Sequence, residues 1–211
     1  MKIVSFSPAE MIITGIIIAI LFFSSIDLVI NLSKNDAVLE NEKTVSECSA
    51  SLTEVISNEF NSSGKVYGAT IENDKPNLIN LDENATGGRG FSAFAILAKQ
   101  NGRDYLKIFH KKLVSGNRAS YYYYIYQLPN GSGDNFDQSA LKNIKKIGES
   151  DLLGSSCYAG VSDNGKEEPF SLQIGSKYQN ESKAVVLRLR DSIYLNNNQS
   201  VFSDINIMEV K

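Results

Sequence analysis

The sequence predicts an α+β fold in which one long N-terminal helix packs on a mainly antiparallel β-sheet. Three observations lead to this prediction. Residues 11–32 form an apolar run with a single charge, Asp27, and apolar residues recur at helical spacing over residues 38–60. From Lys65 onward the period changes to that of strands. A long helix followed by a run of strands is typical of a domain in which the helix covers one face of the sheet.

The first helix is expected to begin at Pro8, because the missing N–H of proline costs nothing in a first helical turn. Ser7 before it is an acceptable N-cap. Residues 8–32 would rise about 1.5 Å each and so cross a bilayer core of about 30 Å. Glu10 lies at the N-terminal end of this span. The helix dipole favours a carboxylate there by only about 0.3–1 kcal/mol, far less than an unpaired charge costs in hydrocarbon, so we expect a cationic partner.

Residues 33–63 are predicted to form an amphipathic second half of the helix. The apolar residues that recur at spacings of three, four and seven are Val38, Val45, Cys48, Leu52, Val55, Ile56 and Phe60. Two alternatives remain for its beginning: one continuous helix, or a break at residues 33–36. Residues 61–64, Asn-Ser-Ser-Gly, are expected to end it.

The remainder, residues 64–211, is predicted to be a β-rich head. Strands are expected at residues 65–71, 91–99, 105–111, 120–128, 170–174, 183–190 and 204–210. Turns are expected at Asn101-Gly102 and Asn164-Gly165, and a short helix at residues 139–147. The tyrosine-rich run 121–126 is either an adhesive aromatic patch or a strand; we favour the strand, with one set of rings buried and the other at its rim.

Composition and charge indicate which kinds of partner the chain is suited to bind. The chain has 211 residues, a formal net charge of −3 and a sequence pI near 5.3, which suit one anchor and one globular domain. The basic clusters at residues 110–112, 142–146 and 188–190 are short and have acidic residues interspersed. We therefore expect solvated faces here, and no nucleic-acid partner.

Cys48 and Cys157 are the two cysteines of the chain, too few for a disulfide scaffold or a zinc cluster. Both follow the predicted anchor, and an oxidising compartment there would favour one disulfide between them. The alternative is two free thiols, with Cys48 filling an apolar position of the helix.

The N-terminal residues resemble a known family. Phe6, Glu10 four residues later, a short polar leader containing Lys2 and an apolar helix behind them are similar to the class III signal of type IV pilins and type II secretion pseudopilins. The resemblance covers roughly residues 1–32. It implies cleavage between Ser5 and Phe6 by a prepilin peptidase and methylation of the new amine. It also implies pairing of Glu10 with the Phe6 amine of a neighbouring subunit. Pro8 and Asp27 favour a minor subunit over a major one.

This resemblance implies a leader at residues 1–5, a transmembrane and assembly helix at 6–32, its amphipathic continuation at 33–63 and a head at 64–211. The protein would wait in the bacterial inner membrane with a cytoplasmic N-terminus, then join a periplasmic or cell-surface filament with other pilin or pseudopilin subunits. The alternative is an uncleaved single-span anchor that presents the head as a binding protein or adhesin.

An enzyme is not expected, and no motif calls for a cofactor. His110 is the single histidine, and nothing in the sequence pairs it with a nucleophile or with metal ligands. The loop 130–137 offers oxygen ligands for calcium, but it lacks the complete calcium-loop pattern, so a plain turn is expected. A third interpretation, an anchored enzyme, would require a deep polar pocket around His110 or this loop.

Overall fold

The computed structural model describes residues 7–62, 64–73, 75–81, 88–129, 141, 144–161, 169–176, 183–195 and 202–210. It divides into two compact units, Met1–Lys43 and Thr44–Lys211. The predicted amphipathic segment 33–63 is thus shared between the two units. Ser5, Phe6 and the loop 130–137 lie outside the described residues.

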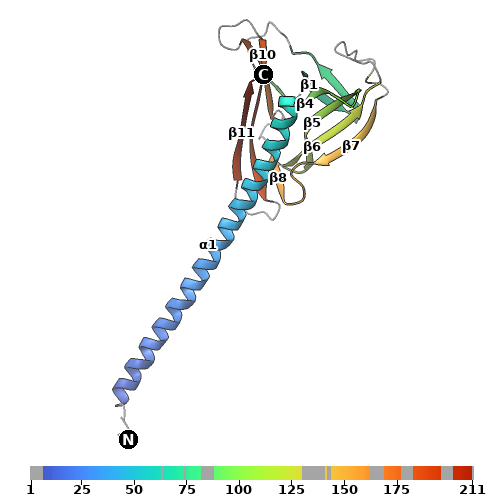
Figure 1. Cartoon of the computed structure of the whole chain (residues 1–211). Coiled ribbons are helices and arrows are strands. Elements are labelled where there is room, and N and C mark those ends of the chain that lie inside the picture. The colour runs from blue at the N-terminus through green and yellow to red at the C-terminus, as the bar shows by residue number, and fades with distance from the viewer. Residues whose placement is uncertain are drawn as a thin grey trace. The chain divides into compact units, whose positions relative to one another are not determined.

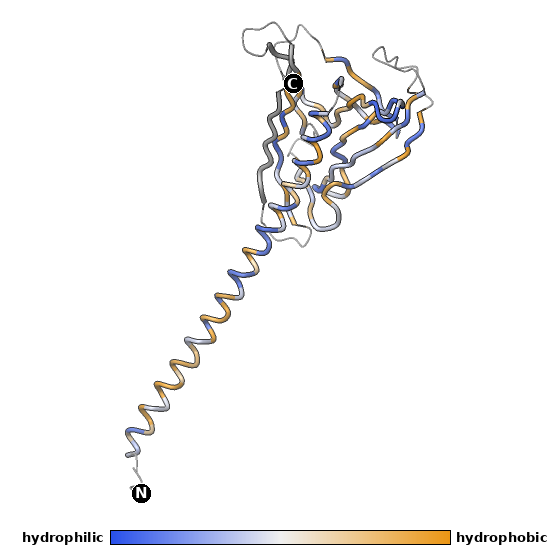
Figure 2. The backbone as a smooth tube through the Cα atoms, viewed as in Figure 1, coloured by the Kyte–Doolittle hydropathy of each residue, from blue (hydrophilic) through white to orange (hydrophobic). Residues whose placement is uncertain are grey.

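Helix α1 spans Pro8–Ser62, a length of 55 residues, and is continuous. The break considered at residues 33–36 is therefore not present; Ser33 and Asn35 are weak helix formers, but the residues on both sides favour the helix. The start at Pro8 is confirmed, and the helix ends within the Asn-Ser-Ser-Gly cluster that was expected to end it. Figure 2 shows the apolar residues that dominate the first part of α1.

The described strands of the head form one antiparallel sheet of 11 strands. They are β1 (Lys65–Glu72), β2 (Lys75–Ile79), β3 (Gly88–Phe91), β4 (Ala93–Gln100), β5 (Arg103–Ser115), β6 (Arg118–Gln127), β7 (Lys145–Asp151), β8 (Cys157–Gly160), β9 (Phe170–Ser176), β10 (Lys183–Leu195) and β11 (Phe202–Val210). Their order is β2-β1-β4-β5-β6-β8-β10-β9-β3, with β11 beside β10 and β7 beside β6. The prediction of an α+β fold with a long N-terminal helix and an antiparallel sheet is confirmed.

The sheet is curled, because the single residue Ser92 joins β3, at one end of the strand order, to β4, near the other end. Phe91 of β3 pairs with Phe170 of β9, whereas Ala93 of β4 pairs with His110 of β5. The bend at Ser92 therefore carries the chain from β3, the last strand of the order, to β4, its third strand. Gly68 of β1 makes room for this bend, since a Cβ there would lie 2.3 Å from the ring of Phe91. Figure 1 shows the last turns of α1 between the β10/β11 pair and strands β1, β4, β5 and β6.

The inner face of the curl packs on the second half of α1. Val45, Leu52, Ile56 and Phe60 are at most 1% exposed and contact side chains from β4, β5, β6, β9 and β10. The ring of Phe60 meets that of Phe94 edge-on at 6.3 Å between centroids. Each such buried side chain contributes about 1.5–3 kcal/mol through removal of apolar surface from water, so the helix is part of the core of the head.

The tyrosine run is a strand, β6, as predicted, but the outer face of the sheet carries a second apolar cluster that also buries tyrosines. Tyr121 belongs to the first cluster, on the face that packs on α1. Tyr124 and Tyr126 are buried in the second cluster with Leu78, Leu128 and Leu141. No tyrosine of residues 121–126 is exposed. Alternation sent successive rings to opposite faces as expected, but both faces of β6 are covered.

The short helix predicted at residues 139–147 is wrong over its second part, where β7 begins at Lys145. The spacing of Leu141, Ile144 and Ile147 suggested a helix, but β8 covers only Arg118 and Ala119 of β6 and leaves the rest of that edge open. Residues 145–151 pair with it, and their largely exposed, charged side chains suit an edge strand. β2 and β8 were also not predicted.

The hairpin between β4 and β5 agrees with the predicted turn. Gln100 and Arg103 pair directly, and Asn101 and Gly102 between them have φ angles of 51° and 75°. Positive φ at both central positions is the type I′ geometry for which Asn-Gly is favoured.

Candidate functional site

The N-terminal end of α1 is closed by reciprocal hydrogen bonds between Ser7 and Glu10. The backbone N–H of Ser7 donates to Glu10 Oε2 at 2.7 Å, and the backbone N–H of Glu10 donates to Ser7 Oγ at 3.3 Å. This is a capping box, which satisfies backbone donors that a helix start leaves unpaired. Glu10 therefore has a local structural role at the site where sequence analysis placed its assembly role.

The apolar span that follows is exposed along its whole length. Fifteen large hydrophobic side chains between Met11 and Leu32 range from 39% to 67% exposed. Helix α1 is long and apolar enough to cross a membrane, judged by length and composition alone. Water does not stabilise such a surface, so the molecule needs either lipid or other apolar helices around residues 11–32.

Cys48 and Cys157 form a disulfide with a Cα–Cα distance of 6.6 Å. It joins the second half of α1 to β8, a strand of only four residues. The alternative of two free thiols is excluded for this structure, in which the two cysteines of the chain are bonded.

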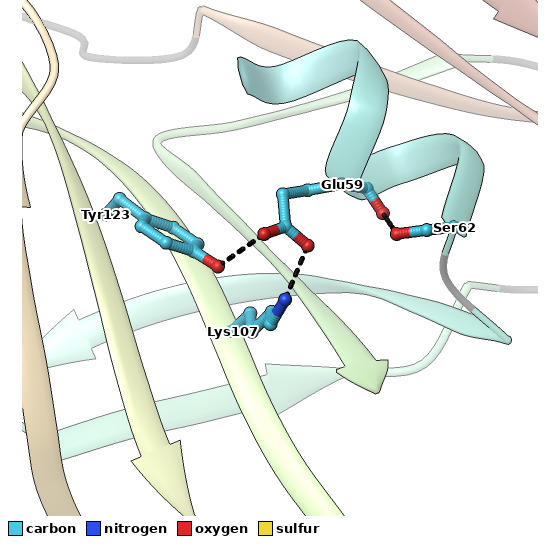
Figure 3. Close-up of polar contacts among 4 residues, drawn as sticks. All are labelled: Glu59, Ser62, Lys107 and Tyr123. Carbon is cyan, nitrogen blue, oxygen red and sulfur yellow. Dashed lines mark hydrogen bonds and ion pairs between the residues drawn. The ribbon is translucent and has the colours of Figure 1, made fainter. Parts of the chain in front are cut away.

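A second tie between α1 and the sheet is polar. Figure 3 shows Glu59 of α1 accepting a hydrogen bond from the Tyr123 hydroxyl at 2.8 Å and pairing with Lys107 Nζ at 2.6 Å. The side chains of Lys107 and Glu59 are only 16% and 23% exposed. Burial, followed by the hydrogen bond to Glu59, raises the pKa of Tyr123 above its ordinary value, so the phenol stays protonated and remains a donor.

A third polar group lies inside the sheet. Lys111 Nζ is 2.7 Å from Asp191 Oδ2, and the Tyr121 hydroxyl donates to the same carboxylate. The backbone N–H of Ser192 donates to Asp191 Oδ1 at 2.9 Å. Burial raises the pKa of Tyr121 well above its usual range, with Asp191 adding to the effect. The group ties β5, β6 and β10 together within a desolvated region, where each charge depends on its partner.

His110 is half-buried beside the ring of Tyr124. Burial, and then the positive charge of Lys112, lower the pKa of His110 to about 4. Its ring is neutral at pH 7, and Nδ1 has no hydrogen-bond partner among the described residues. Among the described residues, no group of three or more His, Cys, Asp or Glu side chains is placed so that it could hold a metal ion.

The basic clusters do not form one surface in the described part of the head. Lys111 is buried in its pair with Asp191, and Lys146 pairs with Glu149 at 2.6 Å. Arg188 and Arg190 are exposed on β10. Lys142 and the calcium-loop candidate at 130–137 fall outside the described residues.

Sequence analysis missed most of these contacts. The capping box has a signal, Ser followed three residues later by Glu, that could have revealed the second role of Glu10. The side-chain pairs around Glu59 and Asp191 join residues 48 to 80 positions apart, and no local pattern reveals such pairs.

Comparisons with family models, with curated proteins and with solved structures found no match to this chain.

Proposed function

We propose that this protein is a minor pilin or pseudopilin, a structural subunit of a type IV pilus or a type II secretion filament. Residues 6–32 would hold it in the bacterial inner membrane, where a prepilin peptidase would remove residues 1–5, until it enters a filament. The helices of several subunits would then bundle, and the heads would face outward. The head would serve as a structural or binding surface, not as an enzyme.

One observation carries this proposal: a carboxylate, Glu10, stands at the beginning of an exposed apolar helix that continues into the core of a disulfide-bonded head. The hydrogen bond to Ser7 does not neutralise the charge of Glu10, which needs a cation wherever the helix start is buried among other apolar helices. Cleavage before Phe6 would create an α-amino group with a pKa near 8, which is positive at neutral pH and can neutralise the carboxylate inside a helix bundle.

The second candidate is an uncleaved, membrane-anchored binding protein, and the capping box favours it. Because Glu10 already accepts a hydrogen bond from Ser7, it has a reason to be there without any neighbouring amine. The N-terminal residue distinguishes the two candidates. Intact-mass analysis of the protein recovered from membranes should show a chain that begins at Phe6 with a methylated amine. A chain that keeps Met1 and Lys2 would favour the anchor and reject the pilin.

Three variants separate the two roles of Glu10. Glu10→Gln keeps a side chain that can complete a capping box but removes the charge, Glu10→Leu removes both, and Ser7→Ala weakens only the cap. Breaking a buried charge pair costs about 3–5 kcal/mol, whereas a lost cap costs about 0.5–2 kcal/mol. We therefore expect Glu10→Gln and Glu10→Leu to be lost from sheared filaments while Ser7→Ala remains there.

The abundance of each variant in the membrane fraction is the control, since all three should still insert. Normal filament entry of Glu10→Gln together with poor entry of Ser7→Ala would show that Glu10 acts as a cap and that no charge pair drives assembly.

A further inference from the structure

The apolar span contains one charged residue, Asp27, and the helix gives it no cation. Side chains meet along a helix at spacings of three and four, and the residues at those distances from Asp27 are Phe23, Ser24, Ile30 and Asn31. Lys34 is the nearest cation in the sequence, seven residues away. The positions three and four residues from Lys34 likewise hold no acid, being Ile30, Asn31, Ala37 and Val38.

Asp27 and Lys34 nevertheless lie on one face of α1. At about 100° per residue, a separation of seven residues returns to within about 20° of the same direction. Ser24 and Asn31 fall on the same face, and the four polar residues span about 80° of the circumference. All four are exposed. We call this set, Ser24, Asp27, Asn31 and Lys34, the polar stripe.

A carboxylate five residues inside the end of a membrane span is costly without a partner, and polar side chains there usually face other helices. We propose that the polar stripe is the surface on which a second copy of this chain packs in parallel, with Lys34 of one copy paired to Asp27 of the next. The occupant follows from charge complementarity: each copy carries one anion and one cation, and each lacks an intrahelical partner.

The pairing requires an axial offset between the copies, because helices in register would place Asp27 beside Asp27. This inference rests on the proposed function, which supplies the offset. If Glu10 of one copy meets the Phe6 amine of the next, the second helix is displaced by about four residues, or about 6 Å. Lys34 then lies level with residue 30 of its neighbour. Its side chain leans toward the N-terminus, in the direction of Asp27, so offsets of about 6 to 10 Å satisfy both contacts.

Disulfide cross-linking in native membranes tests the proposal while leaving the charged pair intact. One tagged full-length chain carries Ser24→Cys, and a second, differently tagged chain carries Asn31→Cys. The natural cysteines do not interfere because they are bonded to each other. We expect mild oxidation to give more of the mixed 24–31 dimer than of the 24–24 or 31–31 dimers, because the offset brings residue 31 of one copy toward residue 24 of the next.

Neutralising either charge in both chains, by Asp27→Asn or Lys34→Gln, should lower the mixed product by about three- to tenfold, the range measured for polar contacts between membrane helices. Asp36→Asn is the matched control, since Asp36 lies well outside the polar stripe on the same exposed helix. It should leave the yield unchanged.

The inference would be overturned by 24–24 and 31–31 dimers that match or exceed the mixed product, or by a mixed product whose yield does not change with Asp27→Asn and Lys34→Gln. Cross-linking of Ser24→Cys to a different membrane protein in place of a second copy would also overturn it. A chain that is cleaved at Phe6 and enters filaments without the 24–31 product would leave the proposed function standing. Conversely, a charge-dependent 24–31 product from an uncleaved chain would support the pairing and reject the pilin.

Discussion

The two halves of α1 use similar apolar side chains for different purposes. In the first half Ile12, Ile16 and Phe22 are more than half exposed, whereas in the second half Leu52, Ile56 and Phe60 are fully buried. Residues 11–23 are apolar all round the helix, so no single packed face can bury them. Residues 44–62 confine apolar side chains to one side, which the curled sheet covers. The angular distribution of apolar residues, more than their number, thus separates the exposed half of α1 from the half that packs in the core.

The disulfide should produce the largest difference between the halves, because it cross-links only the second. It closes a loop with a sequence separation of 109 residues. Removing it by the double substitution Cys48→Ser and Cys157→Ser should destabilise the head by up to about 4–5 kcal/mol, mainly by freeing the unfolded chain. Denaturant unfolding in detergent, followed by tyrosine fluorescence, measures this. Reductant should lower the stability of the natural protein to that of the variant and leave the variant unaffected; a natural protein indifferent to reductant would contradict the prediction.

A matched pair of phenylalanines tests the contrast in burial. Phe60 is 0% exposed and Phe22 is 62% exposed on the same helix. Phe60→Ala should cost the head about 3–5 kcal/mol through the cavity it leaves, while Phe22→Ala should leave head unfolding unchanged. The same denaturant titration compares the two variants. Equal losses would mean that the apolar half of α1 also stabilises the head, and the division between the halves would fail.

The polar tie at Glu59 should have a smaller effect. Glu59→Gln keeps the shape of the side chain but leaves Lys107 without its carboxylate in a mostly buried position. We expect a loss of about 1–3 kcal/mol, between the values for exposed and fully buried pairs. Glu54→Gln on the exposed side of the same segment is the control and should change stability by less than about 0.5 kcal/mol. If Glu54→Gln were as unstable as Glu59→Gln, the loss would come from removing any acidic charge from this segment and not from the contact with Lys107.

The smallest expected effect is a pH dependence confined to the head. The pKa of His110 is lowered from 6.5 to about 4, so between these values the unfolded chain binds a proton that the folded chain does not. Stability should therefore fall as the pH drops from 6.5 to 4. We expect about 1–2 kcal/mol after allowing for the partial exposure of the ring. The unfolding free energy is measured over this pH range for the natural protein and for His110→Gln. The difference between them isolates the contribution of His110, because the carboxylates titrate in both proteins. Parallel curves would contradict the prediction.

The sequence by itself determined the elements whose causes are local. Pro8 marks the helix start, the Asn-Ser-Ser-Gly cluster marks its end, and Asn101-Gly102 specifies a tight hairpin, because each depends on the conformations available to a few neighbouring residues. The capping box of Ser7 and Glu10 was also readable, since both partners lie within one helical turn. The apolar span needed nothing beyond length and composition.

Tertiary structure decided what depends on distant partners. Residues 145–151 became β7 because β6 offered an open edge, which outweighed a local helical pattern. Both faces of the tyrosine run carry buried rings because the helix covers one face and a second cluster the other. A solvated face was expected at residues 110–112, but Lys111 is buried in an ion pair. Its partner Asp191 lies 80 residues further along the chain, where no local pattern could reveal it. Burial and ion pairing depend on which residues of other elements lie nearby. The periodicity of the sequence specifies only the direction in which a side chain points.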